Sequence, residues 1–492
     1  MSEDIPINNP HRRSEPPVFD SLQELNKAEC ALIWCNYAKE AESEGDHTGA
    51  QMGFYNAWSE QPEEFRYFQA VVGYLNRAGQ VDPLIKVYEI GIQLFPHHVE
   101  TFVSFSNLLN LYGFYERAKQ VIEALLARDP SCLPGWGNLG NALRGLGDYQ
   151  GARDCFRKIL AEEPGNVIAA FNLSNVLLSQ EEYEQGWPLY DHRLLLPGYE
   201  RLRHRNTAPV WKGESLESRS ILVYAEQGLG DTFMFSRYLR MLAEAGARVH
   251  FEVQKPIAWL MEDSVEVDMM VIERESLDTL STEKTDYQVS LLSLAGIAHQ
   301  RGWGHEPVGY LEPNLGYSHR AKELLNGLEG IKVGLCWQGN PHAAIDCGRS
   351  LVIESLEPLM DLHPLEFISL QGKDGLEGIE TCFERHKNFN FLPDLDSGMR
   401  AYAESVVLID GVDLVITTDT AIAHLVGAMG KPCWVLLQKY PEWRWGLTSD
   451  ITPWYPSMRL FRQEIAGDWT TLVSQVKEAL TAEYQIPHQG NE

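Results

Sequence analysis

Cysteine is scarce in this chain, and long apolar runs are absent. The 492 residues contain eight cysteines, with no CxxC pair and no regular spacing, which argues against a disulfide framework and favours free thiols in a reducing compartment. No stretch approaches the roughly 18 uninterrupted apolar residues that a membrane span needs. The first residues, MSEDIPINNPHRRSEPP, also lack the apolar run of a signal peptide. We therefore expect a cytoplasmic protein without a membrane span.

Basic residues are in short supply as well. The chain has 41 lysines and arginines against 69 aspartates and glutamates, a formal net charge of -28. Such a surface repels phosphate backbones at long range, so nucleic acid is not expected as a partner.

The chain of 492 residues is longer than one hydrophobic core usually organises, which predicts two or three domains.

The first 190 residues contain an internal repeat. Prolines recur every 34 residues, the period of tetratricopeptide repeats, at Pro62, Pro96, Pro130 and Pro164. The best unit carries that repeat's usual residues: Trp136, Leu139, Gly140, Gly147, Tyr149, Ala152, Phe156 and Pro164. Small residues let two antiparallel helices approach, and each proline ends the second helix of a pair. We predict about five units over residues 21–194, after a flexible N-terminus at 1–20.

Stacked repeats of this kind form concave surfaces that bind peptides, so we expect the array to recognise a protein or peptide partner. The alternative is a passive scaffold or a dimerisation element. The oligomeric state is left open by the sequence.

An irregular stretch at 195–219 indicates a linker. Beyond it, short apolar runs alternate with segments of helical spacing. Strands are predicted at 221–225, 249–253, 331–337, 366–370, 414–418 and 433–437. This alternation predicts parallel sheets with helices on both faces, in one lobe at 220–318 and a second at 319–484, followed by a tail at 485–492.

The motif AEQGLGD, residues 225–231, follows the first predicted strand and opens a helix. Gly228 and Gly230 permit a tight turn close to a ligand, and the helix N-terminus favours negative charge beside it. Asp231 is the candidate general base, able to take the proton of an attacking hydroxyl. A helix N-cap is the alternative role for this aspartate.

Two further motifs leave strands of the second lobe. In GLCWQGNPHAAIDCGRS, residues 334–350, Asn340 and His342 suit contacts with donor hydroxyls or phosphate, and Arg349 suits a bidentate grip on phosphate. In VITTDTAIAHLVGAMGKP, residues 415–432, the helix start at Thr420 offers a diphosphate cradle that needs no metal. Asp419 is then placed for sugar or ribose hydroxyls, with helix capping again the alternative.

Aromatic residues and a pair of aspartates complete the candidates. Trp443 and Trp445 lie beside an arginine, an arrangement that suits stacking on a base or sugar as well as core packing. Asp394 and Asp396 resemble the metal-binding carboxylates of another transferase class, but their loop setting favours a turn. No metal ligand is expected.

Together these strings resemble the tetratricopeptide-linked glycosyltransferases of bacteria, whose catalytic half is similar to the heptosyltransferases and, more distantly, to the O-linked N-acetylglucosamine transferases. The resemblance spans nearly the whole chain and is carried by the repeat period and by EQGWPLYDHR, AEQGLGD, CWQGNPHAAIDCGRS, TTDTAIAHLVGAMGKP and EWRWGL. It implies an all-α solenoid followed by a GT-B pair of Rossmann-like doubly wound lobes. It also implies inverting, metal-independent transfer with Asp231 as the base. Ala421 departs from the heptosyltransferases, which usually have glycine there.

The expected function is transfer of a sugar from a nucleotide diphosphate sugar to a hydroxyl acceptor, such as a flagellin-like protein recruited by the repeats, with no cofactor beyond that co-substrate. A degenerate transferase acting as adaptor or sugar-nucleotide sensor, and a glycan-polymer transferase, are the alternatives. The residues expected to bind the donor are Gln227, Gly228, Gly230, Asn340, His342, Arg349, Ser350, Gln371, Asp419, Thr420, Ala421 and His424.

Overall fold

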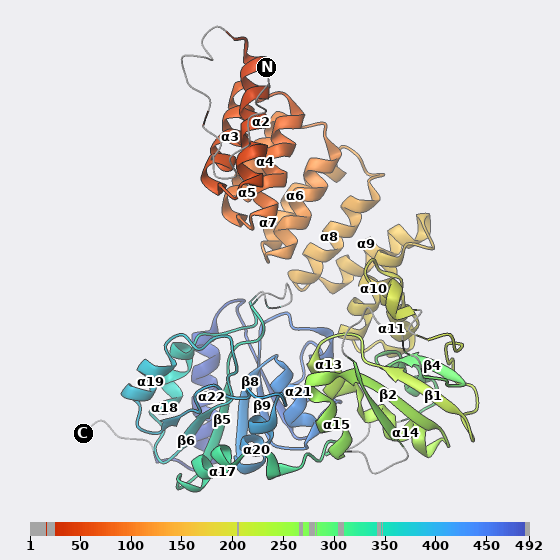
Figure 1. The fold of residues 1–492 in the computed structure, drawn as a ribbon, viewed down its shortest axis with the longest axis vertical. Coiled ribbons are helices and arrows are strands. Elements are labelled where there is room, and N and C mark those ends of the chain that lie inside the picture. Colours follow the sequence, from red (N-terminus) through yellow and green to blue (C-terminus); the bar gives the residue numbers. More distant parts are fainter. Residues whose placement is uncertain are drawn as a thin grey trace, which may run out of the picture. The chain divides into compact units, whose positions relative to one another are not determined.

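The computed structural model describes residues 16, 25–203, 206–264, 269–274, 281, 283–303, 309–341, 346 and 348–487. The chain divides into two compact units, residues 1–142 and 143–492. Figure 1 shows helices alone in the first unit and helices around two sheets in the second. Among the described residues, no helix has both the length and the apolar character that crossing a bilayer requires.

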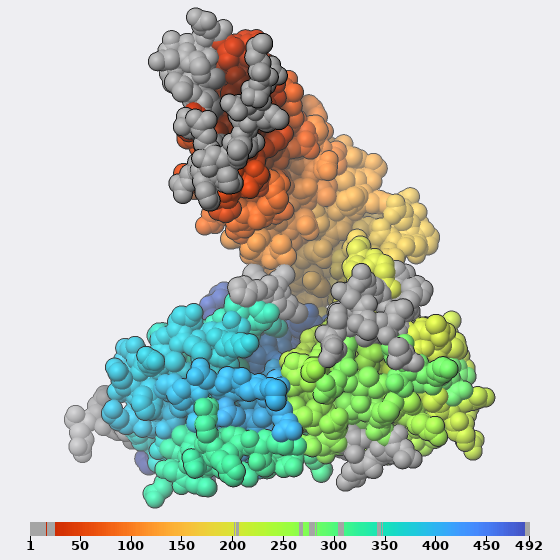
Figure 2. All heavy atoms as spheres, in the orientation of Figure 1, coloured from red at the N-terminus to blue at the C-terminus, as the bar shows by residue number. Residues whose placement is uncertain are grey.

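The first unit is a succession of antiparallel helices (Figure 1), and its described residues run from red to orange in the space-filling view (Figure 2). They are α2 (Lys27–Ser43), α3 (His47–Glu60), α4 (Phe65–Arg77), α5 (Val81–Leu94), α6 (Val99–Leu111) and α7 (Tyr115–Leu126), and α8 (Leu133–Gly145) crosses into the second unit. Pro62, Pro96 and Pro130 follow the ends of α3, α5 and α7, because proline cannot continue a helix. This confirms the predicted helical array.

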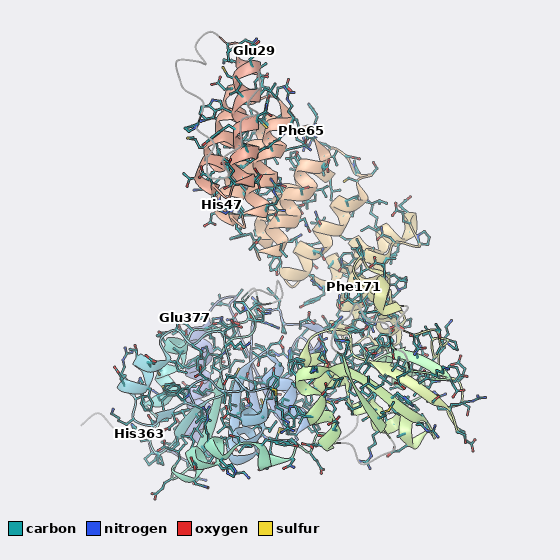
Figure 3. All side chains as sticks on the ribbon, viewed as in Figure 1. Glu29, His47, Phe65, Phe171, His363 and Glu377 are labelled. Atoms are coloured by element: carbon teal, nitrogen blue, oxygen red, sulfur yellow. The ribbon has the colours of Figure 1, made fainter. Side chains whose placement is uncertain are left out.

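Small residues set the spacing between neighbouring helices of this unit. A Cβ added to Gly53 of α3 would lie 2.7 Å from the Cβ of Ala38 in α2, closer than side-chain atoms pack. Phe65, labelled in Figure 3, stacks on His98 with ring centroids 3.7 Å apart and so links the start of α4 to the start of α6. Small residues therefore bring α2 and α3 close together, and an aromatic pair fills the space between α4 and α6.

The second unit begins with the remaining helices of the array. They are α9 (Tyr149–Glu162), α10 (Val167–Ser179) and α11 (Tyr183–Tyr190), followed by η1 (Asp191–Leu195) and α12 (Glu200–Arg203). Phe171 of α10, labelled in Figure 3, packs on Tyr190 with ring centroids 5.9 Å apart. The aromatic residues of α11 therefore lie in a shared core with α10.

A four-stranded parallel sheet follows, in the order β3-β2-β1-β4. Its strands are β1 (Ser220–Tyr224), β2 (Arg248–Gln254), β3 (Met269–Arg274) and β4 (Tyr287–Ser290). Its helices are α13 (Leu229–Phe235), α14 (Arg237–Glu244), η2 (Lys255–Ile257), α15 (Ala258–Ser264) and α16 (Ser293–Gln300). Trp211, in the stretch predicted as a linker, is buried, and its backbone N–H donates to Gln288 O at 2.8 Å. That part of the stretch thus packs on the sheet.

The second sheet is also parallel, in the order β10-β9-β8-β5-β6-β7. Its strands are β5 (Lys332–Cys336), β6 (Glu366–Ser369), β7 (Phe389–Asn390), β8 (Leu414–Thr418), β9 (Cys433–Leu437) and β10 (Met458–Arg462). Its helices are η3 (Leu315–Tyr317), α17 (His319–Asn326), η5 (Ile353–Leu356), α18 (Glu357–Met360), α19 (Ile379–Arg385), α20 (Ala403–Gly411), α21 (Ala421–Ala428), η6 (Trp443–Trp445) and α22 (Trp469–Glu483). All six predicted strands are present, which confirms an α/β second part with parallel sheets.

Candidate functional site

Each sheet reverses its strand order beside its first strand. The chain passes from β1 to β2 and β3 on one side and then returns with β4 on the other, and β5 lies in the same way between β6 and β8. Open parallel sheets bind ligands outside the carboxyl ends of their strands at such a switch point. Of the three motifs chosen from the sequence, the first begins directly after β1, and the other two begin within β5 and β8 and continue past their carboxyl ends.

The helices that leave β1 and β8 start side by side (Figure 1). A Cβ added to Gly230, near the start of α13, would lie 3.0 Å from His424 Cδ2 and 3.3 Å from Ala421 Cα in α21. Only the missing side chain of Gly230 lets the two helix starts approach this closely. The structure therefore brings the Asp231 turn and the Thr420 turn together.

Asp231 is held by two partners. Its Oδ2 accepts the backbone N–H of Gly228 at 3.2 Å, and its Oδ1 accepts from Nη2 of Arg444. Arg444 is 8% exposed, donates also to Glu442 at 2.9 Å, and lies over the Trp443 ring. Gly228, and not Asp231, is thus the N-cap of α13, and Asp231 is its third residue. The bond back to the Gly228 N–H and the pair with Arg444 fix the direction of the carboxylate.

The turn after β8 is buried and polar. Thr417 and Thr420 hydroxyl oxygens lie 3.0 Å apart, and the Asp419 carboxylate lies 3.9 Å from Nη1 of Arg349. Burial raises the pKa of Asp419, and the charge of Arg349 opposes that rise. Ala423 N–H donates to Thr420 O at 3.1 Å. The first turn of a helix offers further N–H groups without acceptors inside the helix, so this turn combines backbone donors with a nearby guanidinium.

The loop after β5 is held by its own polar residues. Arg349 donates from Nε to Asp346 at 3.1 Å, and the Ser350 hydroxyl donates to the same oxygen at 2.6 Å. Ser350 also accepts the N–H of Gly339. Asn340 is exposed, and His342 lies outside the described residues. Ser350 therefore shapes the loop, while Arg349 is presented toward Asp419.

Gln371 braces the ends of β5 and β6. Its Oε1 accepts the N–H groups of Trp337 and Gln338 at 2.9 and 3.0 Å, and its Nε2 donates to Gln338 and Asp374 carbonyls. Because both donor hydrogens and both acceptor positions are used, the amide is committed to the two loops. Gln371 thus holds the loops after β5 and β6 in place.

His424 and the two tryptophans are buried. His424 stacks on Trp445 at 5.2 Å, and its Nδ1 lies 3.0 Å from Tyr455 Oη. Burial, followed by the charges of Arg444, Arg237 and Arg349, lowers the pKa of His424 well below its usual 6.5. Its imidazole is therefore neutral near neutral pH.

Trp443 and Trp445 are 4% and 1% exposed. Trp443 packs edge-on against Trp187 at 5.4 Å and against Tyr190 at 5.7 Å. Of the two roles that the sequence left equal for these tryptophans, the geometry favours core packing, because protein side chains already cover their rings.

The sequence reasoning missed a buried ion pair beside the site. Arg193 of η1 donates to Glu226, directly after β1, from Nε at 3.2 Å and Nη2 at 2.6 Å. Ser290, at the end of β4, donates to the same Glu226 oxygen, and Gln227 donates to Tyr199 Oη at 3.5 Å. Glu226 Oε2 has no hydrogen-bond partner among the described residues. The motif EQGWPLYDHR contains Arg193, so its polar end was the signal that could have suggested this pair.

A cavity of about 520 Å³ lies beyond Gln371, at the carboxyl ends of β6 and β7. Gln371, Gly372, Lys373, the start of α19 and residues 391–395 line it. Asp394 and Asp396 have positive φ angles of 53° and 57°, and Asp396 accepts the N–H groups of Glu404 and Ser405. The predicted turn at these aspartates is therefore confirmed.

Comparisons with known proteins identify the repeats. Residues 134–166 match the tetratricopeptide repeat family. Protein FlbA of Caulobacter vibrioides is 26% identical over 324 residues, which cover 60% of this chain and 52% of that protein, so the chain spans about half the length of this curated relative. Similar solved structures include MamA from Desulfovibrio magneticus (16% identity, TM-score 0.29) and the tetratricopeptide protein TTC0263 of Thermus thermophilus (19% identity, TM-score 0.28). Each covers 36% of this chain, with 98% and 96% of those chains matched.

Proposed function

We propose that this chain is a glycosyltransferase that moves a sugar from a nucleotide diphosphate sugar to the hydroxyl of a protein acceptor. Two Rossmann-like lobes of the GT-B kind and metal-independent inversion are part of the proposal. The observation that carries it is the approach of Gly230 to Ala421 and His424, which places two switch-point turns beside each other. One turn offers a carboxylate and the other offers donors for an anion.

In this mechanism the start of α21 and Arg349 bind the diphosphate. Hydrogen bonds to the diphosphate come from the N–H groups of the first helical turn, the Thr420 hydroxyl and the guanidinium. They strengthen as the leaving diphosphate gains charge. The acceptor oxygen attacks the anomeric carbon on the face opposite the diphosphate, and Asp231 removes its proton. The bond to Gly228 N–H and the pair with Arg444 orient that carboxylate.

The cavity beyond Gln371 suits the nucleoside of the donor. It lies at the same carboxyl edge as the Thr420 turn, because β6 and β7 are parallel to β5 and β8. Its lining combines apolar Leu376, Phe391 and Leu392 with polar Lys373, a mixture typical of sites for small ligands.

A binding protein that senses a sugar nucleotide without turning it over is the second candidate. The observation that favours it is that both Asp231 oxygens already accept hydrogen bonds, from Gly228 and Arg444. In that case a donor would bind at Thr420 and Arg349, but no product would form with any acceptor.

The first test is a thermal-shift screen of nucleotide diphosphates and their sugars on the full chain, because a ligand that binds the native state raises apparent stability. Asp231→Asn is then expected to abolish transfer while donor affinity stays within a few-fold. Turnover by Asp231→Asn equal to that of the wild type would remove Asp231 from the mechanism. A screen without any stabilising nucleotide would contradict both candidates.

A truncation tests the proposed role of the repeats in acceptor binding. A chain of residues 143–492 corresponds to one compact unit and keeps α11 and η1, whose Trp187 and Arg193 pack in its core. We expect it to bind the donor as the full chain does but to lose modification of the protein acceptor. Equal modification by both chains would show that the removed part, α2 to α7 and most of α8, does not recruit the acceptor.

A further inference from the structure

Three side chains of metal-ligating type meet away from the switch-point turns. Glu357 begins α18, Cys382 lies within α19, and His386 directly follows it. One ligand atom from each lies within 4.8 Å of the other two. Cys382 and His386 are four residues apart, and the His386 backbone N–H donates to Cys382 O, so the two side chains leave the same face of one helical turn.

The histidine nitrogen is buried and unsatisfied. His386 Nε2 lies 3.6 Å from Glu357 Oε2 and has no hydrogen-bond partner among the described residues. A buried polar nitrogen left without a partner costs free energy, and a bound cation would satisfy it. The Cys382 thiol is 1% exposed and points to the Met360 thioether, with the sulfur atoms 3.3 Å apart.

We propose that Glu357, Cys382 and His386 form a binding site for a divalent transition metal ion, best suited to Zn²⁺. Zinc takes thiolate, imidazole and carboxylate ligands at about 2.0–2.3 Å in tetrahedral geometry, which separates neighbouring ligand atoms by roughly 3.5 Å. The observed group needs only a small closure to reach that arrangement. Cys382 gives up its thiol proton to solvent on binding, and water takes the fourth position.

Arg385 contacts the carboxylate of this site. Its Nη1 lies 2.6 Å from both oxygens of Glu357, while more than half of its side chain is exposed. A metal ion therefore competes with Arg385 for the carboxylate. Because more than half of the Arg385 side chain is exposed, its guanidinium can move into solvent when a metal ion takes the carboxylate, and its charge stays hydrated.

A bound ion would fix α19 against α18. The start of α19, from Gly378 to Thr381, lines the cavity beyond Gln371, and Glu377, labelled in Figure 3, precedes it. The metal would thus hold one wall of the cavity while taking no part in the transfer reaction. This role is independent of the proposed function.

The test uses the full chain, stripped with a chelator and titrated with Co²⁺ and then Zn²⁺. We expect one Co²⁺ per chain, a thiolate-to-cobalt charge-transfer band in the near ultraviolet, and its loss when Zn²⁺ displaces cobalt. Zinc is favoured in a tetrahedral site because its filled d shell has no preference for octahedral water, whereas Co²⁺ loses ligand-field stabilisation there. Cys382→Ser should remove the band, whereas Cys132→Ser, a cysteine of the first unit, should keep it. His386→Asn should weaken binding more than the roughly 10–100-fold that loss of an outer-shell partner costs.

Arg385→Ala gives an independent measure, because it keeps all three ligands and changes an exposed residue. We expect it to bind Co²⁺ more tightly than the wild type, since the competing cation is gone. Absence of the band in the wild type and Arg385→Ala, its persistence in Cys382→Ser, or weaker binding by Arg385→Ala would each overturn the proposal.

Discussion

Asp231 and Arg444 form an ion pair between the start of α13 and η6, 213 residues apart in the chain. Arg444→Met would leave Asp231 without its cation in a largely buried site. We expect a loss of about 3–5 kcal/mol in the free energy of unfolding, as for other broken buried pairs. Transfer should fall too, because the carboxylate loses its orientation. Urea unfolding measures the first effect and product formation the second.

The control is the double variant Asp231→Asn with Arg444→Met. If the pair itself is responsible, the second substitution should cost less when Asp231 is already neutral. Additive losses would mean that Arg444 acts through Glu442 or Trp443 instead.

The Arg193–Glu226 pair joins the end of the helical array to the end of β1. Arg193 and the Glu226 side chain are almost fully buried, and Arg193 also donates to Ser290 and Ser293. Arg193→Ala should lower the free energy of unfolding of the second unit by about 3–5 kcal/mol. Arg219→Ala, which breaks an exposed pair with Asp286, should cost about 1 kcal/mol or less. If Arg193→Ala and Arg219→Ala lowered the free energy of unfolding by similar amounts, burial of the ion pair would not determine its contribution to stability.

Gly230→Ala tests the approach of the two helix starts. The added Cβ would lie 3.0 Å from His424 Cδ2 and 3.3 Å from a backbone atom of Ala421. We expect about 1–3 kcal/mol of destabilisation from overpacking, together with weaker nucleotide binding in calorimetry. At Gly228 the nearest atom is an Asp231 oxygen at 3.5 Å, so Gly228→Ala should change stability less. If Gly230→Ala bound nucleotides as tightly as the wild type, the contact between Gly230 and α21 would not be part of the nucleotide site.

His424 should make stability depend on pH. Burial holds its pKa well below 6.5 in the folded chain, whereas the unfolded chain takes up a proton near 6.5. Below about pH 6.5 the unfolded state therefore binds the extra proton, and this group removes about 1.4 kcal/mol of stability per pH unit. The contribution is fully present above that pH. Asp419 acts in the opposite sense at lower pH, because burial raises its pKa.

His424→Gln should flatten the slope of unfolding free energy between about pH 6.5 and 5.5, measured by urea unfolding. His319→Gln changes an exposed histidine of the same unit and serves as the control. A slope in His424→Gln equal to that of the wild type would assign the acid sensitivity to other groups.

The sequence predicted the architecture well because its signals are local. The prolines that recur every 34 residues follow helix ends because the proline ring is incompatible with a continuing helix. Short segments such as 414–418 predict buried parallel strands from their own residues, with no knowledge of distant partners. The partners of the charged residues could not be predicted in this way. Arg444 lies beside Asp231 only because the two sheets pack together. The sequence predicts Gln371 as a donor-binding residue, but its four hydrogen bonds to the loops can be seen only in the structure. Asp231, Arg349 and Thr420 remain predictions as functional residues.

The aromatic junction after α10 makes the two ends of the helical array unequal. Trp187, Tyr190 and Arg193 pack into the core of the sheets, so any change in the last pair disturbs that core. The helices from α2 to α7 share a hydrophobic core of their own. Gene duplication or protein engineering can therefore add or remove 34-residue units near the N-terminus. The length of the array would change, while its last helices keep their contacts with the sheets.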